Sequence, residues 1–80
     1  MEKRRIRLDA LQPGERGILR EVLMRGEAAA RMEELGLLPE TELACLYRAP
    51  HASPAAYAVS GAVFALRRED AAQIIVEAVR

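Results

Sequence analysis

Residues 31–41 constrain the fold more than any other segment, because they combine the end of a helix with the start of a strand. Gly36 stands where a helix often ends in a left-handed residue, a conformation that glycine adopts without strain. Leu37 or Leu38 can fold back against the last turn, and Pro39 prevents the helix from resuming. The segment therefore predicts a short helix that stops at a rigid corner.

The predicted helix runs from about Glu27 to Leu35. Ala28, Met32 and Leu35 are spaced by four and three residues, which places them on one face of a helix. We expect this face to pack against the core and the opposite face to be solvated.

Short apolar segments on both sides of this helix predict β-strands. Alternating or paired apolar residues mark them, the first only weakly, at residues 5–8, 17–23, 42–48, 56–60, 62–66 and 74–79. Ser60 and Gly61 predict a tight hairpin between two of these strands, and a short helical turn is expected from Arg67 to Ala71. Five or so short strands around one inserted helix predict a mainly β fold, a small and strongly curved barrel.

Several of these segments carry more specific predictions. The strand at residues 42–48 is apolar on both sides, which is typical of a central or covered strand. The pairs of apolar residues in 17–23 depart from strict alternation and predict a strand with a bulge or with strong coiling. Residues 9–14 form a turn that Asp9 can cap, and the two prolines in residues 49–54 predict a loop.

Composition limits both the size of the protein and the class of its partners. Eighty residues allow one small domain, spanning residues 1–80, and a hydrophobic share of 51% is ordinary for a globular chain. The 12 Lys and Arg residues equal the 12 Asp and Glu residues, so the formal net charge is zero. Dedicated DNA-binding and RNA-binding proteins normally carry a basic excess that neutralises phosphates, and the balance here disfavours that class.

The compartment follows from the cysteine count and from the absence of long apolar runs. Cys45 is the only cysteine, so no disulfide can form within the chain and a reducing compartment fits. No apolar run in the sequence reaches the length of a signal peptide or a membrane span. We therefore expect a cytoplasmic protein.

Residues that could perform chemistry are few. Cys45 lies mid-strand and His51, the only histidine, lies in a loop, so a nucleophile and a base are not expected to meet. A metal site needs grouped ligands, and His51 has no Asp, Glu or Cys close to it in sequence. We predict no catalytic residues, no cofactor and no tight metal site, with His51 as the one candidate for weak metal binding.

The order of these signals resembles the FeoA family, the small cytoplasmic accessory proteins of bacterial ferrous iron uptake. The family's opening Leu-x-x-Leu-x-Pro-Gly corresponds to residues 8–14, and its Arg-Leu-x-x-Leu-Gly corresponds to residues 31–36. Further positions fall on the family's register: Pro39, Thr41, Ala49, Pro50, Pro54, Gly61, Leu66, Arg67, Arg68 and Ala71. The resemblance runs from about Leu8 to Val79 and implies an SH3-like β-barrel with an inserted helix.

Two positions depart from the family pattern. Glu40 replaces the glycine after Pro39, so a left-handed backbone at Glu40 would be strained. His51, Ala52 and Ser53 replace the Leu-Gly-Asp between the loop prolines. A contact that the family makes with this loop would be made differently here.

The resemblance implies a non-enzymatic accessory or regulatory protein that contacts the cytoplasmic domain of a FeoB-type ferrous iron transporter. Such a protein would meet the membrane only through its partner and would bind no nucleic acid, while self-association stays open. The alternative is a detached SH3-like regulatory domain related to the C-terminal domain of DtxR-type iron-dependent repressors. Arg25, Arg31 or Arg67 could also assist a GTPase, although no pattern selects one of them.

The predicted partner-binding residues fall in two exposed places, the helix-to-strand corner and the proline loop. They are Leu37, Leu38, Pro39, Pro50, His51 and Pro54. An alternative for the corner is that at least one of the two leucines closes the helix end onto the core.

Overall fold

The frame of the molecule is one antiparallel sheet. The computed structural model describes residues 4–79, and in this part of the chain six strands are arranged in the order β1-β6-β2-β3-β4-β5. The strands are β1 (Arg4–Arg7), β2 (Arg16–Val22), β3 (Glu42–Arg48), β4 (Ala55–Val59), β5 (Ala62–Leu66) and β6 (Ile74–Val79). The helices are α1 (Gly26–Glu34) and α2 (Arg68–Ala71), with 3-10 turns η1 (Leu8–Ala10) and η2 (Pro50–Ala52). The predicted mainly β fold is confirmed.

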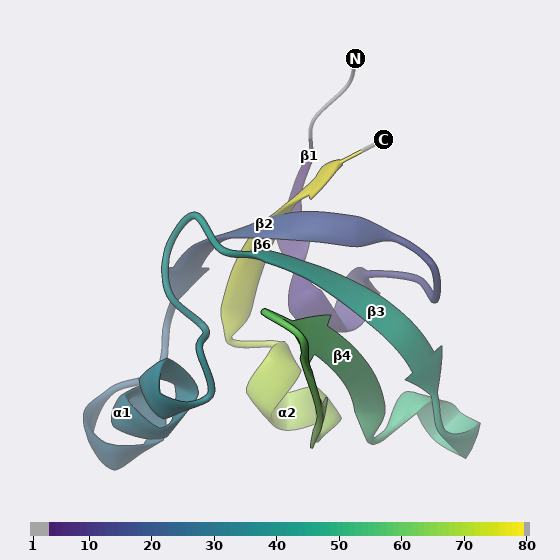
Figure 1. Cartoon of the computed structure of the whole chain (residues 1–80). Helices are drawn as coiled ribbons and strands as arrows, with labels where there is room; N and C mark the ends of the chain where they lie inside the picture. Colours follow the sequence, from purple (N-terminus) through teal and green to yellow (C-terminus); the bar gives the residue numbers. More distant parts are fainter. Residues whose placement is uncertain (1–3, 80) are drawn as a thin grey trace.

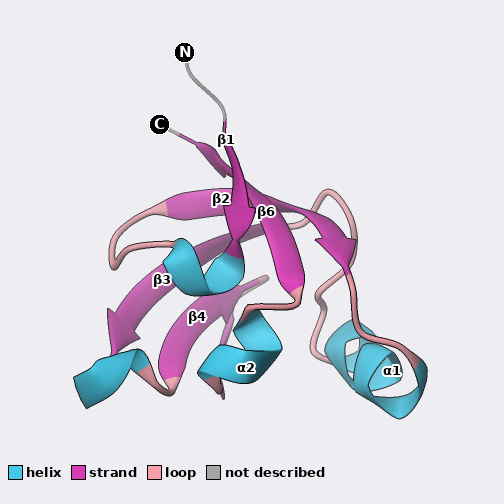
Figure 2. Ribbon diagram, turned by 180° about the vertical axis from the view of Figure 1, so that it is seen from behind, coloured by secondary structure: helices cyan, strands magenta, loops and turns pink. Residues whose placement is uncertain are grey.

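The sheet is strongly bent, which lets its strands enclose a small core. Figure 1 shows β2 and β3 running across the upper part of the molecule, with α2 below them and α1 set to one side. The view from behind in Figure 2 shows α2 below the start of β6 and α1 again to one side of the molecule. The helix inserted between β2 and β3 therefore adds a separate flank to the barrel.

Aliphatic side chains fill the core, as the low aromatic content requires. Tyr57 is the largest fully buried side chain, and its hydroxyl donates a hydrogen bond of 3.5 Å to the Leu8 carbonyl. Burial raises the pKa of Tyr57 to about 12. The buried hydrophobic residues that surround it come from every strand except β1 and include Leu8, Leu11, Leu19, Leu37, Leu43, Ile74 and Val76.

The apolar face of α1 differs from the predicted one. Met32 is buried as expected, but Ala28 and Leu35 are exposed, and Ala29 packs against the core instead. The helix ends at Glu34, and Leu35 is its C-cap, directly before the turn at Gly36. The expected face is therefore wrong at its two outer positions.

The predicted character of β3 is confirmed in part. Its bounds and its central place between β2 and β4 agree with the prediction. However, the pairing with β4 shifts register between Cys45 and Tyr47, and both Leu46 and Tyr47 are exposed. A bulge breaks the alternation of side chains, so the end of β3 is not covered on both faces.

Two further predictions concern the turn at Asp9 and the bulge in β2. Asp9 does not cap the turn, because it lies within η1 and its carboxylate is paired with Arg7 at 2.6 Å. This pairing lowers the pKa of Asp9. The bulge predicted in β2 is confirmed by a register shift between Leu19 and Glu21.

Candidate partner-binding site

The corner after α1 is fixed by its own backbone. The Leu37 N–H donates to the Met32 carbonyl and the Gly36 N–H donates to the Glu33 carbonyl, both at 2.9 Å. This pair of bonds is a Schellman motif, and Gly36 adopts the left-handed conformation that the motif needs, with φ of +93°. The helix stop predicted at Gly36 is confirmed.

The two leucines of the corner have opposite environments. Leu37 is 1% exposed and packs in the core, whereas Leu38 is 45% exposed. The expected exposure of Leu37 is therefore wrong, because the Schellman turn directs its side chain back toward Met32, which is the alternative given for one of the two leucines. Leu38 and Pro39 are the exposed residues of this corner.

A groove runs beside the corner, between α1 and the end of β2. Its volume is about 410 Å³, and its lining is mainly apolar. The residues that line it are Val22, Gly26, Ala29, Ala30, Glu33, Leu37 and Pro39. Glycine and alanine occupy the helix side of this lining, so space remains where larger side chains would fill it. Pro39 joins the groove to the exposed Leu38.

Glu40 stabilises the end of the corner that leads into β3. The backbone at this residue is left-handed, with φ of +73°, the conformation that is costly for a residue other than glycine. The Glu40 N–H donates to the Leu19 carbonyl at 2.8 Å, and its carboxylate accepts from Arg20 at 2.6 Å. Arg20 also contacts Glu77 at 3.0 Å, so one guanidinium connects the corner to β2 and β6. These contacts offset the strain of a left-handed residue that is not glycine.

The second predicted place, the proline loop, borders a different and more polar pocket. Pro50, His51 and Pro54 are exposed there, and His51 also has a left-handed φ of +67°. The Ser53 hydroxyl accepts a hydrogen bond from the Arg68 N–H at 3.1 Å, which ties the loop to α2.

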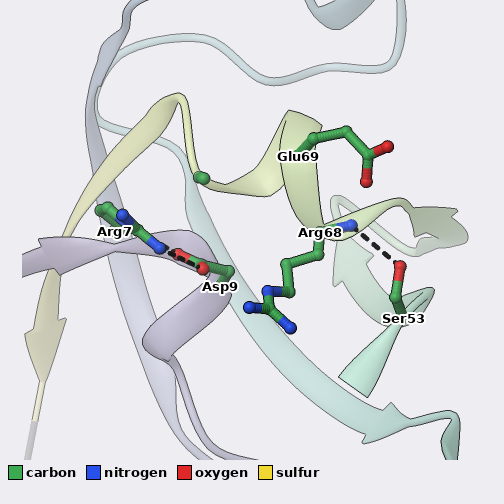
Figure 3. A pocket seen from close by; sticks show the side chains of 6 residues that line it. Arg7, Asp9, Ser53, Arg68 and Glu69 are labelled. Carbon is green, nitrogen blue, oxygen red and sulfur yellow. Dashed lines mark hydrogen bonds and ion pairs between the residues drawn. The ribbon is translucent and has the colours of Figure 1, made fainter. Parts of the chain in front are cut away.

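Figure 3 shows this pocket from close by. The Arg7–Asp9 pair lies on one side, the Arg68 guanidinium extends toward Asp9, and Glu69 stands above. The volume is about 290 Å³ and the charged lining is balanced, with two arginines against two carboxylates. Such a pocket offers polar contacts without a net attraction for ions of one sign.

Cys45 and His51, the candidate nucleophile and base, lie in different environments. Cys45 is buried, and burial raises the pKa of its thiol, so the reactive thiolate is disfavoured. His51 is exposed on the loop and does not line either pocket described above. Among residues 4–79, no group of three or more His, Cys, Asp and Glu side chains could hold a metal ion.

Sequence comparison places the fold in a family. The FeoA domain matches the chain over residues 6–78. The chain belongs to the FeoA domain family. This family is non-enzymatic and contains proteins of ferrous iron transport. No protein of curated function matches the chain.

Solved structures show the same fold. The iron uptake regulatory protein FeoA is 25% identical, with a TM-score of 0.87 over 95% of this chain and 100% of that one. A zinc complex of Stenotrophomonas maltophilia FeoA, described as a procaryotic SH3 domain protein, is 25% identical, with a TM-score of 0.77 over 86% of each chain. A manganese-dependent transcriptional repressor is 20% identical, with a TM-score of 0.85 over 94% of this chain and 41% of that one. The SH3-like fold implied by the family resemblance is confirmed.

The sequence predicted the corner but not the groove or the charged pocket. The signal for the groove is the set of small residues at Gly26 and at positions 28–30, all alanine, where the sequence predicts only the start of a helix. The charged pocket is formed by η1, the proline loop and α2. Because these segments are distant in sequence, no local sequence pattern predicts the pocket.

The helices were also compared with the requirements of a membrane span. Among residues 4–79, none of them has the length and the apolar character that crossing a membrane requires.

Proposed function

We propose that this FeoA-family protein is a cytoplasmic accessory or regulatory component of ferrous iron uptake, acting through contact with the cytoplasmic domain of a FeoB-type transporter. Family membership supports the iron context. Two FeoA structures, each 25% identical to this chain, are described as an iron uptake regulatory protein and as a candidate ferrous iron transport activating factor.

The observation that carries the contact mechanism is the apolar groove beside the exposed Leu38. An exposed leucine on a rigid corner, next to a groove floored by glycine and alanine, can bind an apolar side chain from a partner. The Schellman turn and the Glu40 contacts hold this surface in place, so little conformational entropy is lost on binding.

The alternative is a regulatory domain related to those of metal-dependent repressors. The fold match to the manganese-dependent repressor supports a common architecture. Residues 4–79 contain no pair of helices arranged to enter a DNA groove, so this alternative acts through protein contact as well. The two candidates therefore differ in the partner that they bind.

The test is a substitution at the corner, measured for binding and for stability together. Leu38→Asp is expected to weaken binding to the transporter's cytoplasmic domain by at least roughly thirtyfold, which corresponds to about 2 kcal/mol. Calorimetry measures the affinity, and a thermal melt is expected to stay close to that of the unchanged protein because Leu38 is exposed.

A matched control separates the corner from general surface effects. Leu46→Asp changes a leucine of similar exposure, 43% against 45%, on β3 instead of the corner. We expect it to bind normally. Ala30→Trp fills the groove from its exposed side and is expected to weaken binding as Leu38→Asp does. Unchanged affinity in both corner and groove variants would place the interface elsewhere, with the proline loop as the next surface to test.

A further inference from the structure

The two edges of the sheet are protected very differently. β1 forms one edge and carries Arg4, Arg5 and Arg7, so charged side chains discourage another strand from pairing with it. β5 forms the other edge, and its residues Ala62–Leu66 are all apolar, without a charge or a proline. Natural edge strands usually carry such protection, and its absence from β5 indicates that this edge has a partner.

The hairpin geometry identifies the backbone groups that this edge leaves free. Ser60 and Gly61 have φ of +50° and +83°, as in a type I′ turn, so the closing pair Val59 and Ala62 exchanges hydrogen bonds. Alternation along the ladder then turns the N–H and C=O groups of Val63 and Ala65 away from β4. No other described residue accepts from or donates to these groups.

The space beside this edge is open. Val63 is 63% exposed and Ala65 is exposed on the outer face of the sheet. Ala62 is exposed as well, although the ladder places it on the same face as the half-buried Phe64 and the buried Leu66. The outer face of β5 is therefore accessible, and the inner face is accessible at the start of the strand. Figure 1 shows β5 in front of β4 as the last strand on that side of the sheet.

We propose that the β5 edge pairs with β5 of a second copy of this chain, antiparallel and centred on Phe64. In this register Val63 of one copy lies opposite Ala65 of the other, and the four free N–H groups meet the four free C=O groups. The larger valine side chain meets the smaller alanine on the outer face. The hydrogen-bonding groups of the edge are thus complementary to themselves.

The charges that follow β5 select the antiparallel direction. Arg67 and Arg68 come directly after the strand, and the uncharged Ser60 and Gly61 come directly before it. Antiparallel pairing places each arginine pair beside the uncharged turn of the other copy, whereas parallel pairing would place the arginines side by side. Each chain has one such edge, so pairing closes at two copies instead of growing into a fibre.

The first experiment measures association as a function of concentration. The paired strand has only five residues, so we expect weak, concentration-dependent dimers in sedimentation velocity. Val63→Lys adds a charge to the edge and is expected to keep the protein monomeric. The control is Leu23→Lys, at an exposed leucine outside the β4–β5 hairpin, and it should associate like the unchanged protein. A protein that stays monomeric at millimolar concentration, or a Val63→Lys variant that still associates equally, would overturn the proposal.

The second experiment tests the register. Hydrogen exchange should show protection of the Val63 and Ala65 amides that grows with protein concentration. A mixture of Val63→Cys and Ala65→Cys proteins should form disulfide-linked dimers faster than either variant alone, because the two positions are opposite each other only across copies. Cys45 is buried and does not compete. Protection that arises only when another protein is added would assign the edge to that protein and overturn pairing with a second copy.

Discussion

At the scale of single residues, the corner after α1 depends on two left-handed positions that are stabilised in different ways. Gly36 needs no compensation, because glycine lacks the Cβ atom that makes this conformation costly. Glu40 has a Cβ, and the contacts of its backbone and carboxylate with Leu19 and Arg20 offset the cost. Gly36 and Glu40 thus meet the same backbone requirement, one by lacking a Cβ atom and the other through its contacts.

Substitution of Gly36 tests the first of these positions. A Cβ at Gly36 would lie 3.7 Å from a methyl carbon of Val59, which is an ordinary contact, so the cost of Gly36→Ala comes from the φ of +93°. We expect Gly36→Ala to lower the free energy of unfolding by about 1–2 kcal/mol, and Gly36→Val by more. Gly36→Asn, which tolerates the left-handed region better, should cost less than either. Thermal melts that coincide for all the variants would contradict the left-handed assignment.

At the scale of elements, β3 is joined to the N-terminal turn by one side chain. The Arg48 guanidinium donates to the carbonyls of Asp9 and Leu11, both at 2.6 Å. These carbonyls belong to the segment around η1, whose leucines Leu8 and Leu11 are fully buried. Arg48 therefore holds a core-forming turn against the central strand.

Arg48→Met is expected to destabilise the protein by about 2–3 kcal/mol, because hydrogen bonds to a charged group are lost and two carbonyls lose their donor. The control is Arg16→Met, at an arginine of β2 that lies opposite Ala44 of β3. Arg16 is paired with Glu42 at 3.1 Å, and both side chains are largely exposed, so its loss should change stability by less than 1 kcal/mol. Equal denaturation midpoints for the two variants would show that the Arg48 contacts are not structural.

The elements also show how far the sequence alone determines the fold. The bounds of β3, β5 and β6 follow from local β propensity and from turn residues such as Ser60 and Gly61, so they were predictable. The exposed end of β3 was not, because the register shift beside Tyr47 arises from pairing with β4. The groove was also missed, since it depends on how α1 lies against β2, and side-chain spacing within the helix carries no information on that distance.

At the scale of the whole molecule, the iron context comes from the family and not from a ligand set. His51, the only histidine in the sequence, lies on an exposed loop. The described residues 4–79 contain no cluster of side chains that could bind a metal ion. Purified protein is therefore expected to bind ferrous iron no more tightly than the His51→Ala variant. Anaerobic calorimetry measures this. A stoichiometric site of micromolar affinity that disappears in the variant would contradict the prediction.

The pairing of β1 with β6 has a practical consequence for such measurements. Arg4 lies opposite Ala78, so the two ends of the described chain leave the molecule side by side, while α1 lies at the opposite end in both views (Figures 1 and 2). A fluorescent protein or an affinity handle fused to either end would therefore extend away from the groove. Immobilisation through that end would present the corner at Leu38 to a soluble transporter fragment, which suits surface-based capture assays.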